Sequence, residues 1–509
     1  MKTVSFTPMA KPTITATLAL ALVLSMGQFA AAQVSKEELE SISTPDSVMT
    51  PIGELKFFDG VPTDDTVEMV YDNLDRMRGV QVFLNTIGGA SVYRLRAGNA
   101  KIGADKSNRV TISSQLLDSK SLYLTANTST LYAQVFLDTE IDGPTVIEIP
   151  PGMLGLVNDA WFRYVGDLGV IGPDKGKGGK YLVLPPGYKG NVPSGYFVLR
   201  PKTFWSWAFV RGSTAKGLKP EVEKMTSKIK VYPLAKAANP PKTEFIDMSG
   251  LSYNTISPND FSFYEDLNQL IQKEPIDALD PETRGLVASI GIVKGKPFKP
   301  DARMKKLLTE AVAIGNATAR AILFKPREKA AYFYPDSDSS WVMAYFGKDV
   351  FFEVDGARNL DARTNFFYAY TAVSPAMAVT MAGKGSDYAM AARDSKKQPL
   401  DGGMTYKLHL PPDVPVNNFW AVTMYDTQTR SQLQTRNPLP TLGSQSKGMM
   451  KNADGSYDIF FGPKPPKGKE GNWLETVPGK SWFTILRMYG PLKPWIDKTW
   501  RPGEIELVK

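Results

Sequence analysis

A stretch in the first half of this 509-residue chain recurs in the second half with the same internal spacing. In each copy a tryptophan is followed by an aspartate six positions later, as Trp161 with Asp167 and as Trp420 with Asp426. Further along, residues 175–187 match residues 467–479 without a gap, at a constant offset of 292 (467 minus 175). Similarity of this kind within one chain predicts that a structural unit occurs twice.

The composition favours strands joined by tight turns, with 42 glycines, 38 prolines and an aromatic share of 11%. The chain is also too long for one ordinary core. We therefore expect a mainly β protein with two jelly-roll or β-sandwich-like modules, which arose by internal duplication and are joined by a helical segment. The expected parts are a signal peptide at 1–32, an N-terminal β module with one leading helix at 33–240, a helical connector with the start of the second domain at 241–400, and a C-terminal β module at 401–509.

The first 32 residues have the three parts of a secretory signal peptide. Lys2 and Lys11 supply positive charge, residues 18–26 are apolar, and residues 30–32 are alanines that offer a cleavage site. The apolar run is shorter than the roughly 20 residues that span a bilayer. We expect cleavage and no membrane span afterwards; the alternative is an uncleaved anchor. Because the chain also lacks cysteine, the sequence predicts a periplasmic or secreted protein.

The charge balance gives no indication of a nucleic-acid partner. Removal of Lys2 and Lys11 with the signal peptide lowers the 60 basic residues to 58, against 52 acidic residues, so the net charge is +6 (58 minus 52). These basic residues are spread over loops rich in glycine and proline, whereas a surface that follows phosphates concentrates them.

Helical and strand periodicities alternate along the chain. Helices are predicted at 63–83, 261–271, 301–324 and 361–373. Short strands are predicted at 91–95, 109–113, 122–124, 131–137, 146–149, 161–165, 180–184, 196–199 and 203–210. The second copy differs by an insertion at 428–459, which includes a hairpin turn at 452–455. Such added loops are frequent carriers of function.

These motifs resemble a bacterial two-domain family, in which domain of unknown function 1254 is followed by domain of unknown function 1214. The matching segments are 143–144, 149–151, 158–161, 172–181 and 185–188 in the first half, and 401–403, 410–412, 419–420, 425–426, 429–430, 454–456, 462–463, 470–473 and 482–491 in the second. The resemblance covers roughly residues 50 to 509. It implies two β-rich, jelly-roll-like modules separated by helices, and it brings no catalytic residue.

Several reaction classes are disfavoured because their residues are missing. His409 is the only histidine, and its position in an alternating strand favours a surface role. Zinc hydrolysis, cupin-like iron chemistry and a Ser-His-Asp triad are therefore unsupported. No phosphate-binding glycine motif of a nucleotide site is present. We expect no cofactor and no metal.

Carboxylate chemistry survives these exclusions, because glycosidic bonds are cleaved by two carboxyl groups without histidine. Asp426 and Glu470 in the second module are the predicted catalytic pair. The competing interpretation of Asp426, and of Asp167 in the first copy, is structural: a carboxylate just after a strand accepts backbone N–H groups of a turn.

Five further residues are predicted to contact a substrate: Arg430, Asn472, Trp473, Lys175 and Lys177. The lysines belong to Lys-Gly-Lys loops, where glycines let backbone N–H groups converge on an anion such as phosphate, sulfate or a uronic acid. A solvated turn explains the same residues equally simply. The aromatic run of residues 203–209 and the tryptophans of the second copy fit a sandwich core better than a sugar-stacking surface.

Two functions from different classes follow. The first is a carboxylate-dependent hydrolase that acts on a carbohydrate or a similar polar polymer. The second is a non-catalytic envelope protein that binds glycans or proteins through aromatic loops. A serine esterase with a lysine or tyrosine base stays open as a third. An enzyme predicts a deep cleft with two carboxyl groups about 5 to 10 Å apart, and a binder predicts an aromatic patch without such a pair.

Overall fold

The computed structural model describes residues 34–508, so the predicted signal peptide lies outside the described residues. The chain divides into two compact units at Leu74 and Asp75. The first unit contains a short helix and a three-stranded sheet in the order β1-β2-β3. Its elements are α1 (Lys36–Ile42), β1 (Ser47–Thr50), β2 (Gly53–Phe58), β3 (Val61–Pro62) and the first turns of α2 (Asp64–Lys101).

Helix α2 is much longer than predicted, and the strand expected at 91–95 is wrong because the helix continues through it. Small residues explain the length. A Cβ on Gly89 would lie 2.5 Å from the Trp161 ring, and one on Gly98 would lie 2.5 Å from the Asn254 carbonyl oxygen. These glycines let other parts of the second unit pack directly on the helix, and this contact outweighs their low helix propensity.

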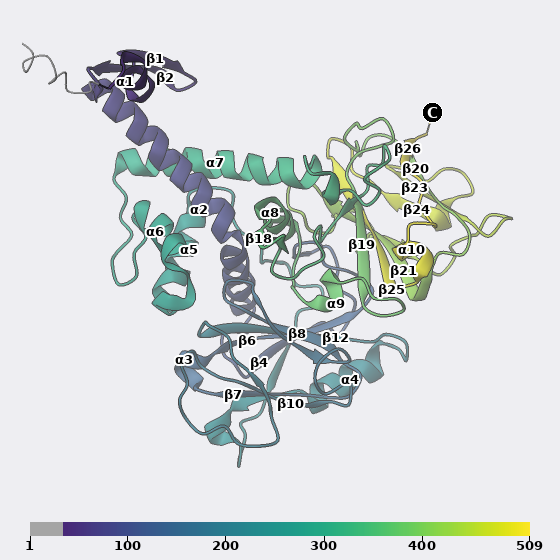
Figure 1. The fold of residues 1–509 in the computed structure, drawn as a ribbon. Coiled ribbons are helices and arrows are strands. Elements are labelled where there is room, and N and C mark those ends of the chain that lie inside the picture. Colours follow the sequence, from purple (N-terminus) through teal and green to yellow (C-terminus); the bar gives the residue numbers. More distant parts are fainter. Residues whose placement is uncertain (1–33, 509) are drawn as a thin grey trace, which may run out of the picture. The chain divides into compact units, whose positions relative to one another are not determined.

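The N-terminal β module consists of two sheets that share one hydrophobic core. The larger sheet has the order β14-β4-β6-β12-β8-β9 and the smaller one β11-β10-β7-β13. The strands are β4 (Arg109–Ile112), β6 (Leu131–Asp138), β7 (Thr145–Ile149), β8 (Leu154–Asp159), β9 (Tyr164–Gly169), β10 (Gly179–Val183), β11 (Phe197–Leu199), β12 (Trp205–Gly212), β13 (Lys230–Pro233) and β14 (Glu244–Asp247). Short helices α3 (Thr139–Asp142) and α4 (Leu218–Lys228) and a two-stranded pair, β5 (Ser121–Leu122) with β15 (Tyr253–Asn254), complete this part (Figure 1).

The C-terminal β module is also a pair of sheets around one core. Its sheets have the orders β16-β19-β25-β21-β22 and β24-β23-β20-β26. The strands are β16 (Val342–Met343), β19 (Ser386–Ala391), β20 (Tyr406–Leu410), β21 (Val416–Asp426), β22 (Thr441–Gly443), β23 (Tyr457–Gly462), β24 (Trp473–Glu475), β25 (Trp482–Pro491) and β26 (Ile505–Leu507). The small hairpin of β17 (Glu353–Val354) with β18 (Ala357–Arg358) follows β16 in the sequence. The short helices α9 (Pro375–Ala378) and α10 (Lys493–Ile496) precede β19 and follow β25.

The two modules have the same strand order along the chain and across each sheet. The order β4-β6-β12-β8-β9 corresponds to β16-β19-β25-β21-β22, and β11-β10-β7-β13 corresponds to β24-β23-β20-β26. Even the pairing direction agrees, since β10 with β11 and β23 with β24 are both parallel pairs. This topology makes β12 the counterpart of β25.

The match at an offset of 292 does not follow this topology. The loop at Lys175 leads into β10, which lies inside its sheet, whereas the loop at Lys467 leads into β24, an edge strand. Likewise, Asp167 lies within β9 but Asp426 ends β21. The sequence repeat therefore pairs residues of non-equivalent strands.

Three helices lie in the sequence between the β modules and a fourth follows β16; three of the four are close to prediction. They are α5 (Ser262–Lys273), α6 (Pro281–Ser289), α7 (Ala302–Phe324) and α8 (Leu360–Ala369). Short 3-10 turns occur along the chain at Leu234–Lys236, Ile276–Ala278, Lys329–Ala331 and Glu470–Asn472. Asp301 begins α7 by accepting a hydrogen bond from the Met304 N–H at 2.7 Å. Only α7, within residues 34–508, has the length and composition of a membrane span, a test that core helices also pass.

Over the described residues the chain is 28% helical and 27% strand. It is thus a mixed protein with many strands in several sheets and ten helices, not a mainly β protein. The long α2 and the helices before β16 account for the difference, because their apolar stripes form the largest hydrophobic cluster together with the outer faces of the larger sheets.

Candidate functional site

A cavity lies between the larger sheets of the two modules. Its walls come from β6 and β12 of the first module, from β19 and β25 of the second, and from the end of α8. Its empty space, with the open solvent at its mouth counted in, amounts to about 660 Å³. Aromatic side chains dominate the lining: Tyr123, Tyr132, Trp207, Phe209, Tyr345, Phe366, Tyr370 and Tyr388. No aspartate or glutamate is among the lining residues in the described part of the chain.

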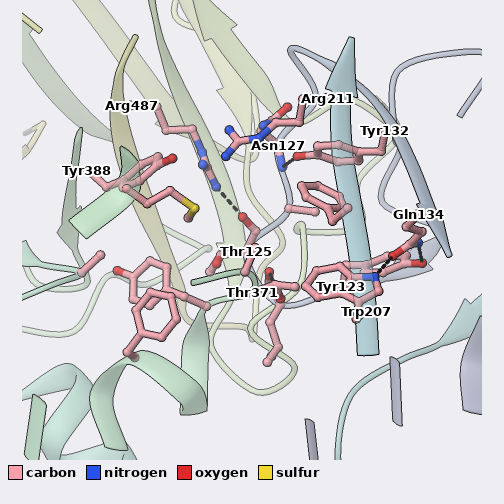
Figure 2. A pocket seen from close by; sticks show the side chains of 18 of the residues that line it. Tyr123, Thr125, Asn127, Tyr132, Gln134, Trp207, Arg211, Thr371, Tyr388 and Arg487 are labelled. Atoms are coloured by element: carbon pink, nitrogen blue, oxygen red, sulfur yellow. Dashed lines mark hydrogen bonds between the residues drawn. The ribbon is translucent and has the colours of Figure 1, made fainter. Parts of the chain in front are cut away.

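Each module contributes one arginine to this cavity from an equivalent strand. Arg211 lies on β12 directly opposite Tyr132 of β6, and Arg487 lies on β25 directly opposite Tyr388 of β19. Because β12 corresponds to β25 and β6 to β19, the same Arg-Tyr pair occurs at the same place in both modules. Figure 2 shows both arginines in the part of the cavity beside these tyrosines.

Arg487 is buried, with 6% of its surface exposed, and is held by fixed partners. Its guanidinium donates to the Thr125 carbonyl oxygen and, at 2.7 Å from Nη2 and 3.2 Å from Nε, to the Tyr425 hydroxyl. The Tyr425 hydroxyl in turn donates a hydrogen bond to the Ala126 carbonyl oxygen at 2.9 Å. The guanidinium carbon of Arg487 lies 5.2 Å from the centre of the Tyr388 ring. These contacts fix the position of the Arg487 side chain without a carboxylate.

Arg211 is held much more loosely. Tyr388 lies beside it, the Phe209 ring centre lies 6.0 Å from its guanidinium carbon, and no hydrogen bond from this guanidinium to protein is found within residues 34–508. It keeps some accessible surface, as a side chain on a cavity wall does. Neither Arg211 nor Arg487 forms a salt bridge with a carboxylate anywhere in residues 34–508. Two cations thus share a largely water-excluded space without a counter-charge, which is costly unless an anion joins them.

Hydroxyl groups around the arginines supply further donors. Tyr132 accepts a hydrogen bond from the Asn127 N–H at 3.1 Å, so its own proton is available. The hydroxyls of Tyr370 and Tyr489 are buried and have no hydrogen-bond partner within residues 34–508. Gln134 is fully used, since it accepts from the Trp207 indole at 3.0 Å and donates to Tyr123 at 2.6 Å. The donors near the arginines therefore exceed the acceptors.

Burial keeps the tyrosines neutral. It raises the pKa of Tyr132, Tyr370, Tyr425 and Tyr489 above the ordinary value for a phenol. For Arg487, burial opposes the charged form but the surrounding tyrosine oxygens outweigh it, so the pKa lies above its usual range. The cavity therefore carries two positive charges at neutral pH.

The predicted catalytic residues lie elsewhere, in two separate turns. Asp426 accepts hydrogen bonds from the Gln428 N–H at 2.7 Å and the Thr429 N–H at 3.4 Å, and its other oxygen pairs with Lys480. Glu470 is exposed and accepts from the Gly468 N–H at 3.1 Å. Neither lines the cavity between the modules. The geometry of Asp426 is that of the competing structural interpretation, a cap on the turn after β21.

Three of the predicted binding residues are engaged inside the protein. Arg430 is 3% exposed, donates to the Tyr368 and Gln428 carbonyl oxygens at 3.1 and 2.9 Å, and lies 4.0 Å from the centre of the Tyr368 ring. Asn472 exchanges hydrogen bonds with the backbone of Met450 at 2.7 and 2.8 Å. Trp473 donates its indole N–H to the Gly462 carbonyl oxygen at 2.9 Å. All three hold the second module together.

In the first module, the loop that was predicted to bind an anion uses its N–H groups for hydrogen bonds within the protein. Lys175 and Lys177 are exposed, but the loop N–H groups are consumed internally. The Asp174 carboxylate accepts from the Gly178 N–H at 2.8 Å and from the Tyr181 hydroxyl at 2.7 Å, and the Lys177 N–H bonds to the Asp174 carbonyl oxygen at 3.0 Å. A carboxylate already occupies the position that was expected for an external anion.

The aromatic run before Arg211 was placed in the core by its pattern, and Trp205 and Trp207 are indeed buried there. His409 on β20 pairs with Asp458 on the neighbouring strand, Nδ1 to Oδ1 at 2.8 Å, as a strand-surface residue. Sequence reasoning did not identify Arg211 as a site residue. The register of β12 against β6 identifies Arg211, and no sequence spacing gives that register.

Comparisons with known proteins identify the two domains. Residues 107–233 match the protein family of unknown function DUF1254, and residues 385–493 match the protein family of unknown function DUF1214. No curated protein matches the chain. The order of the two domains is the one that the sequence motifs indicate.

Two solved structures are similar to this chain. The VPA0106 protein from Vibrio parahaemolyticus is 18% identical, with a TM-score of 0.52 over 86% of this chain and 100% of that chain. A putative uncharacterized protein from Burkholderia cenocepacia is 12% identical, with a TM-score of 0.38 over 86% of this chain and 96% of that one. At such identities the first likeness speaks for the fold alone.

Proposed function

We propose that this chain, a member of the two-domain family that joins DUF1254 to DUF1214, binds a small organic anion in the cavity between its two β modules. One observation carries the proposal: Arg211 and Arg487 enter an aromatic-lined cavity that has no carboxylate in the described part of the chain. Buried cations are normally paired. An anionic ligand would supply the missing charge, and the aromatic walls would contact its apolar part.

Arg211 is the residue on which binding should depend most. Its guanidinium has donors left for a ligand, whereas Arg487 is already bonded to Thr125 and Tyr425. An arginine presents its N–H groups as a planar fork that matches a carboxylate or phosphate. Arg211 therefore acts as the ligand contact, and Arg487 adds charge from a fixed position.

Calorimetric titration with benzoate and with the neutral benzamide tests this function. We expect the wild-type protein to bind benzoate in preference to benzamide, and Arg211→Met to lose about tenfold or more in benzoate affinity, the worth of a charge-assisted hydrogen bond. Arg200→Met is the matched control, because Arg200 is exposed at the end of β11 and lines no part of this cavity. Equal affinities in all three proteins would overturn the proposal.

The earlier predictions of partner and location remain proposals. A carbohydrate or polar polymer as substrate, with Asp426 and Glu470 as catalytic pair, is tested by a glycan and ester screen alongside Asp426→Asn and Glu470→Gln. Activity that both variants leave unchanged would remove that assignment. A periplasmic or secreted location is tested by fractionating cells that express the full chain.

We also propose that the two modules arose by duplication, and that each resembles a jelly roll. Support comes from the shared strand order, the shared parallel pair and the equivalent Arg-Tyr positions. An experimental structure tests the idea: superposing the equivalent strands should place Arg211 on Arg487. A superposition that shifts these residues by one or more positions would contradict it.

A further inference from the structure

The cavity between the modules holds more positive charge than one simple anion neutralises. Arg211 and Arg487 each bring a full charge, and the tyrosines around them are neutral. Both arginines line the same cavity, together with Tyr132 and Tyr388. They therefore border one shared space and do not form two separate sites (Figure 2).

The donors that remain after internal bonding belong to both modules. On Arg487, Nε and Nη2 are bonded to Tyr425 and Thr125, and Nη1 has no bond to protein in residues 34–508. On Arg211, no hydrogen bond to protein uses the fork within residues 34–508. The hydroxyl of Tyr370, which also lines the cavity, has no hydrogen-bond partner in the described part of the chain. A ligand that used these donors would touch both modules at once.

Resting on the proposed function, we propose that the ligand carries two negative charges on an aromatic body, so that one molecule neutralises Arg211 and Arg487 together. The chemistry fits either a phosphate ester, with both charges on one group, or a dicarboxylate, with one charge at each end. The body packs against the aromatic walls, of which Trp207 and Phe209 lie on the same face of β12 as Arg211. A singly charged ligand would leave one buried cation without a partner.

Matched pairs of ligands that differ in charge and little else test the proposal. Phenyl phosphate is compared with methyl phenyl phosphate, and terephthalate with its monomethyl ester, by calorimetric titration at pH 7.5. We expect the doubly charged member of at least one pair to bind about tenfold tighter or more, because a second charge-assisted hydrogen bond increases the affinity by about that factor. The pair that shows the difference tells whether the two charges sit on one group or at two ends.

The Arg211→Met variant separates this proposal from the proposed function. Removal of one charge should reduce the preference for the doubly charged member to about two- to threefold or less, while Arg200→Met should retain it. If the members of both pairs bind wild-type protein equally and Arg211→Met weakens both equally, the cavity binds anions but the double charge is wrong. If none of these four compounds and not even benzoate binds, the proposed function itself fails.

Discussion

The two β modules place an arginine on the same central strand but support that strand in different ways. A glutamate from another element holds the start of β12: the Glu274 carboxylate accepts hydrogen bonds from the Phe204 and Trp205 N–H groups at 2.6 and 3.1 Å. A neutral acceptor holds the start of β25: the Trp482 N–H donates to the Leu400 carbonyl oxygen at 3.3 Å. The arginines differ in how they are held: hydrogen bonds fix Arg487 on β25, whereas Arg211 on β12 is not fixed in this way. Two modules of equivalent topology can therefore differ in how firmly they hold the arginine side chain, and only the loosely held Arg211 has most of its donors free for a ligand.

The largest expected effect concerns Glu274 and pH. Burial raises its pKa from 4.5 to about 8, so between these values the folded protein binds more protons than the unfolded chain. The free energy of unfolding is therefore highest below about pH 4.5 as far as this group is concerned, and it falls as pH rises through about 8. The loss across this range is on the order of 5 kcal/mol, since each pKa unit corresponds to about 1.4 kcal/mol.

Glu274→Gln checks this assignment. Glutamine keeps one acceptor oxygen but places an NH₂ group against the other backbone N–H, so the variant should be less stable at pH 5 and have a flatter pH profile. Urea unfolding between pH 5 and pH 8.5 measures both. A variant profile as steep as that of the wild type would show that the pH dependence arises outside the start of β12.

The second prediction compares the two arginines directly. Arg487→Met leaves the Thr125 carbonyl oxygen without its donor and the Tyr425 hydroxyl with less support, so we expect a loss of about 2 to 3 kcal/mol. Arg211→Met removes a charge that has no carboxylate partner, so stability should stay the same or rise slightly. Urea unfolding without ligand measures both. Equal losses would mean that Arg211 is as structural as Arg487, and the contrast between the modules would disappear.

Much of the fold was accessible from the sequence, because local patterns determine it. The apolar spacing behind Asp301 predicts α7, and the alternation in residues 131–137 predicts β6, as observed. The predicted helix at 63–83 ends well before Lys101, and α2 continues through Gly88 and Gly89. Their role depends on a distant residue, Trp161, whose ring packs on Gly89 and whose carbonyl oxygen lies beside Gly88. Such contacts between remote segments are invisible to a local pattern.

The candidate site was less accessible, for a related reason. Residues that stand out in a sequence, such as the Lys-Gly-Lys loops, often form turns, and Gly178 illustrates this: its φ is +78° and a Cβ would lie 2.8 Å from the Ile149 carbonyl oxygen. The aligned Glu470 has no such constraint, so the two loops differ despite similar letters. Arg211, by contrast, looks like an ordinary residue at the end of a strand. Its importance arises from register and from the missing carboxylate, which are properties of the assembled sheets.

The smallest effect is expected at Asp426, where the catalytic and structural interpretations diverge. Asp426→Asn keeps an oxygen for the Gln428 N–H but loses the charge that pairs with Lys480, whose side chain is 47% exposed. An ion pair with one exposed partner is worth little, so the loss of stability should be about 1 kcal/mol or less. Affinity for benzoate should not change, because Asp426 does not line the cavity between the modules. Lys480→Met is the control that removes the same pair from the other side. If Asp426→Asn abolishes ligand binding while Lys480→Met does not, the carboxylate has a functional role and the contrast between a structural turn and a binding cavity is wrong.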